Sequence, residues 1–188
     1  MNTIDVLPIF HSSTTMKLVK LDDGRKIFPS ITFDEMIKIA NSDEWEFDKD
    51  QISLSILKFI DPTVSDEALN YDRTTENKLL RYEEINEPII KEVYKVNIGY
   101  STEHSIILFG DYTVYTNEEE GKIGTKKVSE LNKGDAILSK IFGNVISALS
   151  ILDITKIGDY ELEKYIRLYP DEGDIISVGS DSVEIFVN

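Results

Sequence analysis

Four residues in the second half of the chain carry side chains suited to acyl transfer. Ser101 lies three positions before His104, just after a run of β-branched and aromatic residues. A hydroxyl can hold or attack a carbonyl group, and an imidazole can move protons near neutral pH. Asp174 and the last residue, Asn188, add a carboxylate and a carboxamide. Each has an ordinary explanation when taken singly, as a polar strand edge, a turn or a chain end. Their order along the chain is therefore more informative than any one of them.

Composition excludes several other kinds of chemistry. The 188 residues include no cysteine and two histidines, His11 and His104, so we expect no thiol nucleophile, metal site or cofactor. A formal net charge of -15 opposes nucleic-acid binding, which needs a basic patch. No apolar run approaches the length of a membrane span, and the chain shows no secretion signal. We therefore expect a cytoplasmic, monomeric protein of a microbial or phage-infected host cell.

Short strand patterns separated by turn residues run through most of the chain and predict an all-β domain. Three pairs of runs flank turn residues and are predicted as β-hairpins: 16–21 with 25–28, 105–109 with 112–115, and 174–178 with 183–187. Further strands are expected at 3–8, 79–82, 89–98, 126–128 and 136–138, and at 144–157 as a strand pair or one curved strand.

Two earlier stretches depart from this pattern. Thr32 and Glu35 have capping-box spacing, and apolar residues follow at helical spacing, which predicts a short helix over 33–40. Residues 41–70 are the least patterned part of the chain, and the apolar positions over 52–57 fit either a strand or a helix. We interpret 41–70 as an insertion with modest structure of its own within a single domain that spans residues 1–188.

The succession of segments resembles the intein family, whose Hint fold is an all-β horseshoe of curved hairpins with one or two short helices. In that family a strand with a Tyr-x-Val pattern precedes a hydroxyl-x-x-His motif. Here Tyr94-Lys95-Val96 precedes Ser101-Thr102-Glu103-His104, with serine where threonine is usual. The segment that typically follows, with Gly-Asp before a strand, is similar to residues 130–138. The resemblance covers essentially the whole chain and is thinnest over 41–70.

Two further segments carry the resemblance at the end of the chain. The family's late aspartate motif is similar to residues 173–178, where Asp174 keeps the aspartate and Gly173 replaces a tyrosine. The family ends in asparagine, which Asn188 matches, but its usual penultimate histidine is Val187 here. The first segment is most similar to inteins of family-B DNA polymerases.

The resemblance implies protein splicing, a single-turnover reaction in which the chain excises itself and joins its flanking segments, the exteins. It implies that His104 protonates the upstream leaving group, that Ser101 holds the amide and that Asp174 relays a proton. It also implies that Asn188 cyclises to cut the downstream bond. The partners are the exteins of the same chain or a complementary intein fragment, with neither membrane nor nucleic acid involved.

The sequence leaves alternatives for both splice junctions. Inteins begin with cysteine or serine, whereas Met1 occupies that nucleophile position here, and we expect it to replace a serine. The alternative is that Ser12 or Ser13 is the first residue. Downstream, the domain ends either at Asn188 or at Gly179 with Ser180 as nucleophile. Residues 41–70 and 117–124 are the expected places for a natural split.

A second hypothesis is a non-enzymatic all-β interaction module, such as a phage or virion accessory domain. It predicts scattered site residues, whereas the intein hypothesis predicts that Ser101, His104 and Asp174 converge near both chain ends. The short distance in sequence between His104 and Asp174 leaves no room for a DNA-cleaving insertion, so we expect a splicing-only domain without a homing endonuclease.

Overall fold

Fifteen strands make up most of the part of the chain that a computed structural model describes. The described residues are 3–6, 19–21, 41, 45–47, 53–59, 73–99, 103–118, 123–141, 145–171, 175–179 and 183–187. Within these ranges the one helical element is a 3₁₀ turn, η4 (Val128–Glu130). No helix in the described ranges has the length and apolarity that crossing a bilayer requires. The all-β prediction is confirmed. The strands are β1 (Ile4–Val6), β2 (Val19–Leu21), β3 (Trp45–Phe47), β4 (Ser53–Phe59), β5 (Arg73–Leu79), β6 (Arg81–Ile85), β7 (Ile89–Gly99), β8 (Glu103–Phe109), β9 (Thr113–Asn117), β10 (Ile123–Lys127), β11 (Ala136–Ile141), β12 (Val145–Leu162), β13 (Tyr165–Tyr169), β14 (Ile175–Gly179) and β15 (Val183–Val187).

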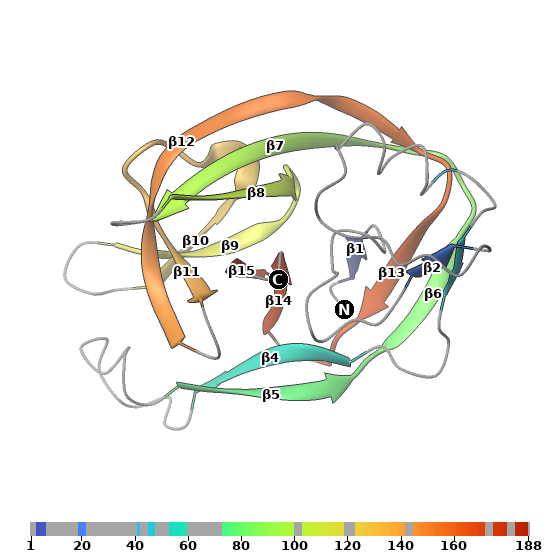
Figure 1. Cartoon of the computed structure of the whole chain (residues 1–188), viewed down its shortest axis with the longest axis horizontal. Helices are drawn as coiled ribbons and strands as arrows, with labels where there is room; N and C mark the ends of the chain where they lie inside the picture. Colours follow the sequence, from blue (N-terminus) through green and yellow to red (C-terminus); the bar gives the residue numbers. More distant parts are fainter. Residues whose placement is uncertain are drawn as a thin grey trace.

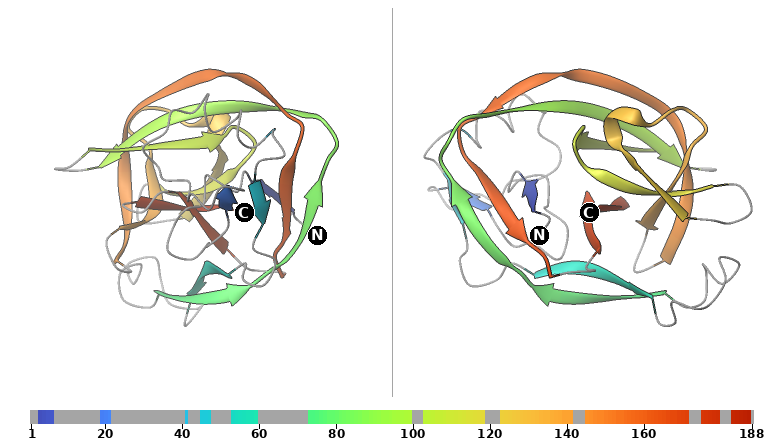
Figure 2. Two further views of the ribbon diagram at one scale, coloured as in Figure 1. Left: turned by 45° about the vertical axis from the view of Figure 1, so that its right-hand side comes forward. Right: turned by 180° about the vertical axis from the view of Figure 1, so that it is seen from behind.

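The described strands form three sheets. The largest has ten strands in the order β5-β4-β14-β15-β9-β11-β12-β7-β8, with β10 paired to β9. A second sheet has the order β1-β13-β6, and β2 pairs with β3 in the third. In Figure 1 the long strands β7 and β12 arch over one side, β6 and β13 follow on the next, and β4 and β5 close the far side. The strands β1, β14 and β15 lie inside this ring, and Figure 2 shows the same ring from two other directions.

The arch is one continuous antiparallel pairing of β7 with β12. The register shifts twice along it, between Ile151 and Asp153 and between Lys156 and Gly158. Such irregularities bend a strand and increase its twist, and β12 curves strongly in Figure 1. The expectation of a strand pair or curved strand over 144–157 is therefore resolved as one curved strand of 18 residues.

The two ends of β7 bury opposite faces of the strand, and the hydrophobic core packs against both. Near its start β7 buries Lys91 and Val93, and near its end it buries Val96 and Ile98. The buried positions change from odd to even numbers, so the strand turns opposite faces toward the protein interior as it crosses the molecule. One cluster of buried side chains joins both ends, and it includes Ile4 and Val6 of β1 and Leu168 of β13 together with Val187 of β15.

The first and last predicted hairpins have different outcomes. β14 pairs with β15, which confirms the hairpin over 174–178 and 183–187 in its described part. In the first, β2 lies within 16–21, but its described partner is β3; residues 25–28 are outside the described residues.

The predicted hairpin of 105–109 with 112–115 is wrong. The two strands exist as β8 and β9, but β8 pairs with β7, and β9 pairs with β10, β11 and β15. The turn at Gly110 and Asp111 does form, with the Tyr112 amide donating to the Phe109 carbonyl at 3.2 Å. The turn does not pair β9 with β8, because Gly110 is held against β7. The Gly110 amide donates to the Glu92 carbonyl at 2.8 Å. A β-carbon at Gly110 would lie only 2.8 Å from the Tyr94 ring.

Within 41–70, the choice between strand and helix at 52–57 is resolved as a strand. β4 pairs with β5 along its length and with β14 at Leu57 and Ile56, so this segment is part of the largest sheet. The predicted helix over 33–40 lies outside the described residues. Three described strands were not expected from the sequence, namely β3, β13 and most of β5.

Candidate functional site

His104 is the one predicted site residue whose position is described. Met1, Ser101, Asp174 and Asn188 lie outside the described residues, as do the alternative nucleophiles Ser12, Ser13 and Ser180. Their predicted convergence must therefore be judged from the strands that adjoin them in sequence.

His104 lies near the start of β8, opposite Ile98 of β7, and its side chain is partly buried. The same strand, β7, carries Tyr94 and Val96 of the preceding motif. β8 also contacts β14, whose first residue, Ile175, directly follows Asp174 in sequence. The strands that adjoin the serine–histidine motif and the late aspartate motif are therefore in contact with each other.

The first and last described strands meet at β9. Tyr112, just before β9, donates its phenolic hydroxyl to the backbone carbonyl of Asp5 in β1 at 2.8 Å. Val114, two residues further, pairs with Val187 of β15. β1 and β15, at opposite ends of the sequence, are thus linked through residues 112–114, β1 by the Tyr112 side chain and β15 by backbone pairing. Both strands also contribute side chains to the same buried cluster.

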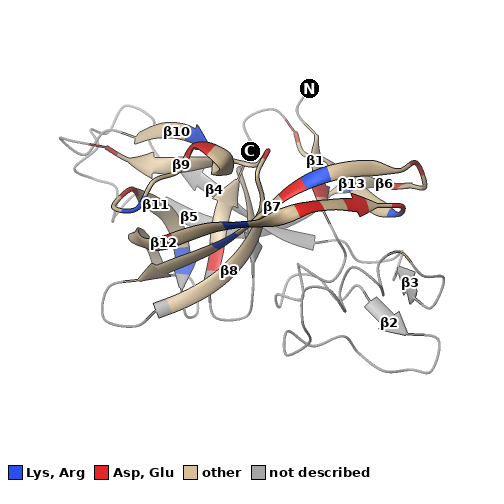
Figure 3. Ribbon diagram, turned by 90° about the horizontal axis from the view of Figure 1, so that it is seen from above, with Lys and Arg blue, Asp and Glu red and all other residues tan. Residues whose placement is uncertain are grey.

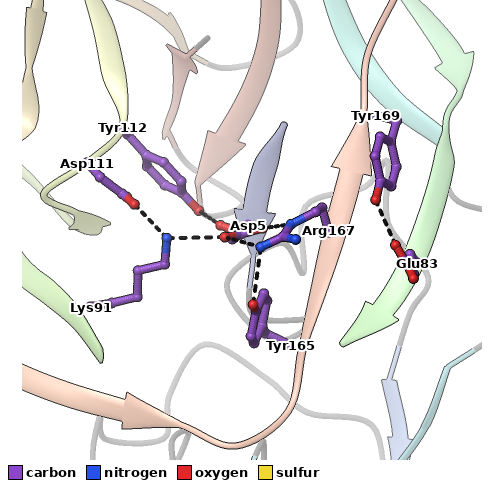
Figure 4. Close-up of polar contacts among 8 residues, drawn as sticks. All are labelled: Asp5, Glu83, Lys91, Asp111, Tyr112, Tyr165, Arg167 and Tyr169. Atoms are coloured by element: carbon purple, nitrogen blue, oxygen red, sulfur yellow. Dashed lines mark hydrogen bonds and ion pairs between the residues drawn. The ribbon is translucent and has the colours of Figure 1, made fainter. Parts of the chain in front are cut away.

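Asp5 is the centre of a network of charged groups beside that meeting point (Figure 4). The Asp5 carboxylate accepts from Arg167 Nε at 2.8 Å and from Lys91 Nζ at 3.3 Å. The same ammonium donates to Asp111 at 2.5 Å, and Arg167 Nη2 donates to the Tyr165 hydroxyl at 3.2 Å. Side-chain exposure is 10% for Asp5 and 7% for Lys91. The network thus joins β1, β7, β13 and the turn before β9.

The two least exposed charged groups of the network, Asp5 and Lys91, lie beside each other and beside further groups of opposite charge. A buried charge is tolerated where an opposite charge and hydrogen bonds compensate its lost hydration. The hydrogen bond to Asp5 is the main cause that raises the pKa of Arg167 above its ordinary value. Burial, and then the charges of Asp111 and Asp5, raise the pKa of Tyr112 well above its ordinary value. Figure 3 shows acidic and basic positions along β7, the strand that carries Lys91.

A second shielded ion pair lies on the other terminal strand. Lys140 of β11 faces Glu184 of β15 in the ladder, with Nζ 3.2 Å from Oε2 and each side chain 10% exposed. The Ser177 hydroxyl of β14 donates to Glu184 Oε1 at 3.2 Å. This pair holds the strand that precedes Asn188, much as the Asp5 network holds the strand that follows Met1.

Sequence reasoning missed both ion networks, although one signal for the first is present. Lys91 is in phase with Val93, so strand alternation places it on a buried face, whereas its neighbour Ile90 is 70% exposed. A lysine at an inward position of a strand requires a buried anion, and the single acid within the Ile4–Val6 strand is the natural partner.

In the described part of the chain, no group of three or more His, Asp or Glu side chains is placed to hold a metal ion. The side chains that the sequence suggests for the site are hydroxyl, imidazole, carboxylate and carboxamide groups. Such groups suit acyl transfer within a chain whose ends are already held together.

Comparison with known proteins gives similarity at the level of solved structures. No family model matches the chain, and no curated protein matches it. The chain is similar to a KlbA intein precursor from Methanococcus jannaschii, at 14% identity over 100% of this chain and 91% of that one, with a TM-score of 0.49. It is similar to the TvoVMA intein at 16% identity over 89% and 92%, with a TM-score of 0.46. It is also similar to the DnaX mini intein from Spirulina platensis at 14% identity over 79% and 93%, with a TM-score of 0.44.

Proposed function

We propose that this chain is a splicing-only mini-intein that excises itself by intramolecular acyl transfer with serine nucleophiles. The observation that carries the proposal is that β1 and β15 share one buried cluster and are linked through residues 112–114, by the Tyr112 bond to Asp5 and the pairing of Val114 with Val187. A protein that joins the segments on its two sides needs both of its ends at one place. An interaction module has no such requirement.

The proposed reaction begins with the hydroxyl of a serine at position 1. Its oxygen attacks the preceding carbonyl carbon, the C–N bond breaks, and the hydroxyl proton is transferred to the departing amine. A downstream serine then attacks the resulting ester and frees the first hydroxyl. The Asn188 carboxamide nitrogen next attacks its own backbone carbonyl, forming a succinimide and releasing the downstream amine. That amine displaces the ester oxygen and forms the new peptide bond.

We assign roles to the site residues on the sequence resemblance and on this chemistry. His104 protonates the upstream amine, Ser101 holds the scissile amide or the oxyanion, and Asp174 relays a proton between the two acyl transfers. Holding reactants in one chain supplies most of the catalytic advantage, because well-oriented intramolecular reactions reach effective molarities of about 10⁵ M or more. The chain therefore needs few catalytic side chains.

The first segment's likeness to inteins of family-B DNA polymerases supports such a polymerase as the host protein. In this proposal Met1 stands in the position of the first nucleophile, and Asn188 is the last residue of the excised segment. The segments 41–70 and 117–124 are the proposed regions in which a naturally split form would be divided.

The test is a fusion with reporter proteins on both sides, the Met1→Ser substitution and a serine after Asn188. The proposal expects a ligated reporter pair and a freed 188-residue chain. His104→Ala should lower the upstream cleavage rate by at least about 100-fold, the usual scale for a general acid. His11→Ala, at the chain's other histidine, is the matched control and should splice normally.

A folded fusion that neither splices nor cleaves would favour the interaction module. Cleavage at one end alone would keep the proposal but move the junction to Ser12 or Ser13 upstream, or to Ser180 downstream.

A further inference from the structure

β1 is a very short strand that is shielded on both of its faces. Ile4 and Val6 point into the main buried cluster, at 2% and 0% exposure. Asp5 points the opposite way, where Lys91 and Arg167 hold its carboxylate. The strand's three residues thus present an apolar pair to one side and a single anion to the other.

This arrangement fits only one register against β13. Ile4, Asp5 and Val6 lie opposite Leu168, Arg167 and Ile166. A slip of one residue exchanges the faces of a strand, because side chains alternate with a period of two. Asp5 would then enter the apolar cluster, and an aliphatic side chain would replace it beside two cations. Leaving a buried charge uncompensated is strongly destabilising.

We propose that the Asp5 ion pairs set the register of β1 and thereby position the upstream splice junction. The inference rests on the proposed function, since it concerns the same junction. Asp5 touches none of the reacting atoms, so it is a positioning residue. Position 1 lies four residues before Asp5, at most about 14 Å away along the extended chain.

The magnitudes support a role in positioning. A slip of one residue would move the attached junction by about 3.3 Å. A misplacement of about 1 Å can already lower a reaction rate by about 100-fold. By comparison, a shielded ion pair adds little to net stability over an apolar substitute, and its best-documented use is to select one register among several.

The first experiment measures the two cleavage steps separately in the reporter fusion. Upstream ester formation is followed as hydroxylamine-dependent cleavage in the Met1→Ser fusion. Downstream cleavage is followed in the fusion that keeps Met1, where the upstream step is blocked. Asp5→Asn should lower the upstream rate by about 100-fold and leave the downstream rate within about twofold. The matched control is Glu92→Gln. Glu92 directly follows Lys91 in β7 and forms an exposed ion pair with Lys156, so this substitution should change neither rate.

The second experiment tests register directly by cross-linking. Continuing the β1–β13 register by one residue places Thr3 opposite Tyr169. Since the chain has no cysteine, Thr3→Cys with Tyr169→Cys gives one possible disulfide, and directly paired strand positions have suitable geometry. The disulfide should form readily with Asp5 present and less completely with Asp5→Asn. In the Asp5→Asn background, the oxidised form should recover the upstream rate, and reduction with a phosphine should remove the recovery.

The two claims fail in different ways. If the Met1→Ser fusion with Asp5 intact neither cleaves nor ligates, the proposed function fails, and cross-linking yield still decides whether Asp5 sets the register. If that fusion splices but Asp5→Asn leaves the upstream rate unchanged, or lowers both rates equally, the positioning role is overturned. Unchanged cross-linking in Asp5→Asn would overturn the register claim.

Discussion

Asp5 and Arg167 face each other across the β1–β13 ladder, with the guanidinium Nε donating to Asp5 Oδ1 at 2.8 Å and Nη2 to Oδ2 at 3.4 Å. The pair is therefore a two-point contact between a planar cation and a carboxylate. It joins a strand near the start of the chain to one that begins 161 residues later. In the proposed mechanism, the position of the upstream junction depends on how firmly this contact fixes β1.

Replacing Arg167 with lysine should weaken that contact while keeping its charge. A lysine cannot match both carboxylate oxygens with a planar fork, and it loses the hydrogen bond to the Tyr165 hydroxyl. Arg167→Lys should lower the free energy of unfolding by about 1 kcal/mol, measured as a reduced urea midpoint at unchanged slope. Equal midpoints for the two proteins would show that the fork adds nothing beyond charge.

The Lys140–Glu184 pair should be more costly to break than an exposed pair. Glu184→Gln leaves the Lys140 ammonium shielded beside a neutral amide, and losing one partner of a buried pair typically costs about 3 kcal/mol. Glu92→Gln, at an exposed pair, should cost at most about 1 kcal/mol. Urea unfolding of the two variants measures both values. A similar small loss in both would mean that the Lys140–Glu184 pair is effectively hydrated.

Tyr112 should make the protein less stable at alkaline pH. Because burial raises its folded-state pKa well above 10.0, the folded protein keeps the phenolic proton after the unfolded chain has released it. Above pH about 10, the free energy of unfolding should therefore fall with rising pH, by up to about 1.4 kcal/mol per unit from this group. Below that pH the phenol is protonated in both states and adds no slope.

Tyr112→Phe isolates this contribution. It should lower stability near pH 7 by about 1 kcal/mol, through loss of the bond to the Asp5 carbonyl, and flatten the alkaline slope. Urea unfolding at a series of pH values measures both effects. An unchanged slope above pH about 10 would mean that Tyr112 titrates normally in the folded protein.

Gly134 should resist substitution for a backbone reason. Its φ of 96° lies in the left-handed region, and a β-carbon there would meet nothing within 4 Å. Gly134→Ala should therefore cost about 1–2 kcal/mol from backbone strain alone, and Gly134→Asn less. Lys133→Ala in the same turn is the control and should be nearly neutral. Thermal unfolding measures all three, and a neutral Gly134→Ala would contradict the strain argument.

Local patterns predicted strands better than they predicted which strands pair. Alternating and β-branched runs located β7, β11, β12 and the β14–β15 hairpin, because side-chain period and turn residues are local properties. The error at β8 and β9 arose because a turn at Gly110 is compatible with either a hairpin or a change of partner. Its contact with Glu92 and Tyr94, distant in sequence, decides the outcome.

The ion networks depend on long-range contacts in the same way. Asp5 acquires its partners from residues 91 and 167, and no spacing rule connects three such distant positions. Strand alternation places Lys91 in phase with Val93 on a buried face, but it does not show which acid lies opposite.

The mass of the products from the Met1→Ser fusion tests the central claim most directly. Splicing by the proposed route yields a ligated reporter pair joined by a peptide bond and a freed chain of 188 residues. The freed chain should be one water lighter than its hydrolysed form, because Asn188 ends as a succinimide. A folded fusion that keeps its full mass, with neither a ligated nor a cleaved product, would contradict the claim.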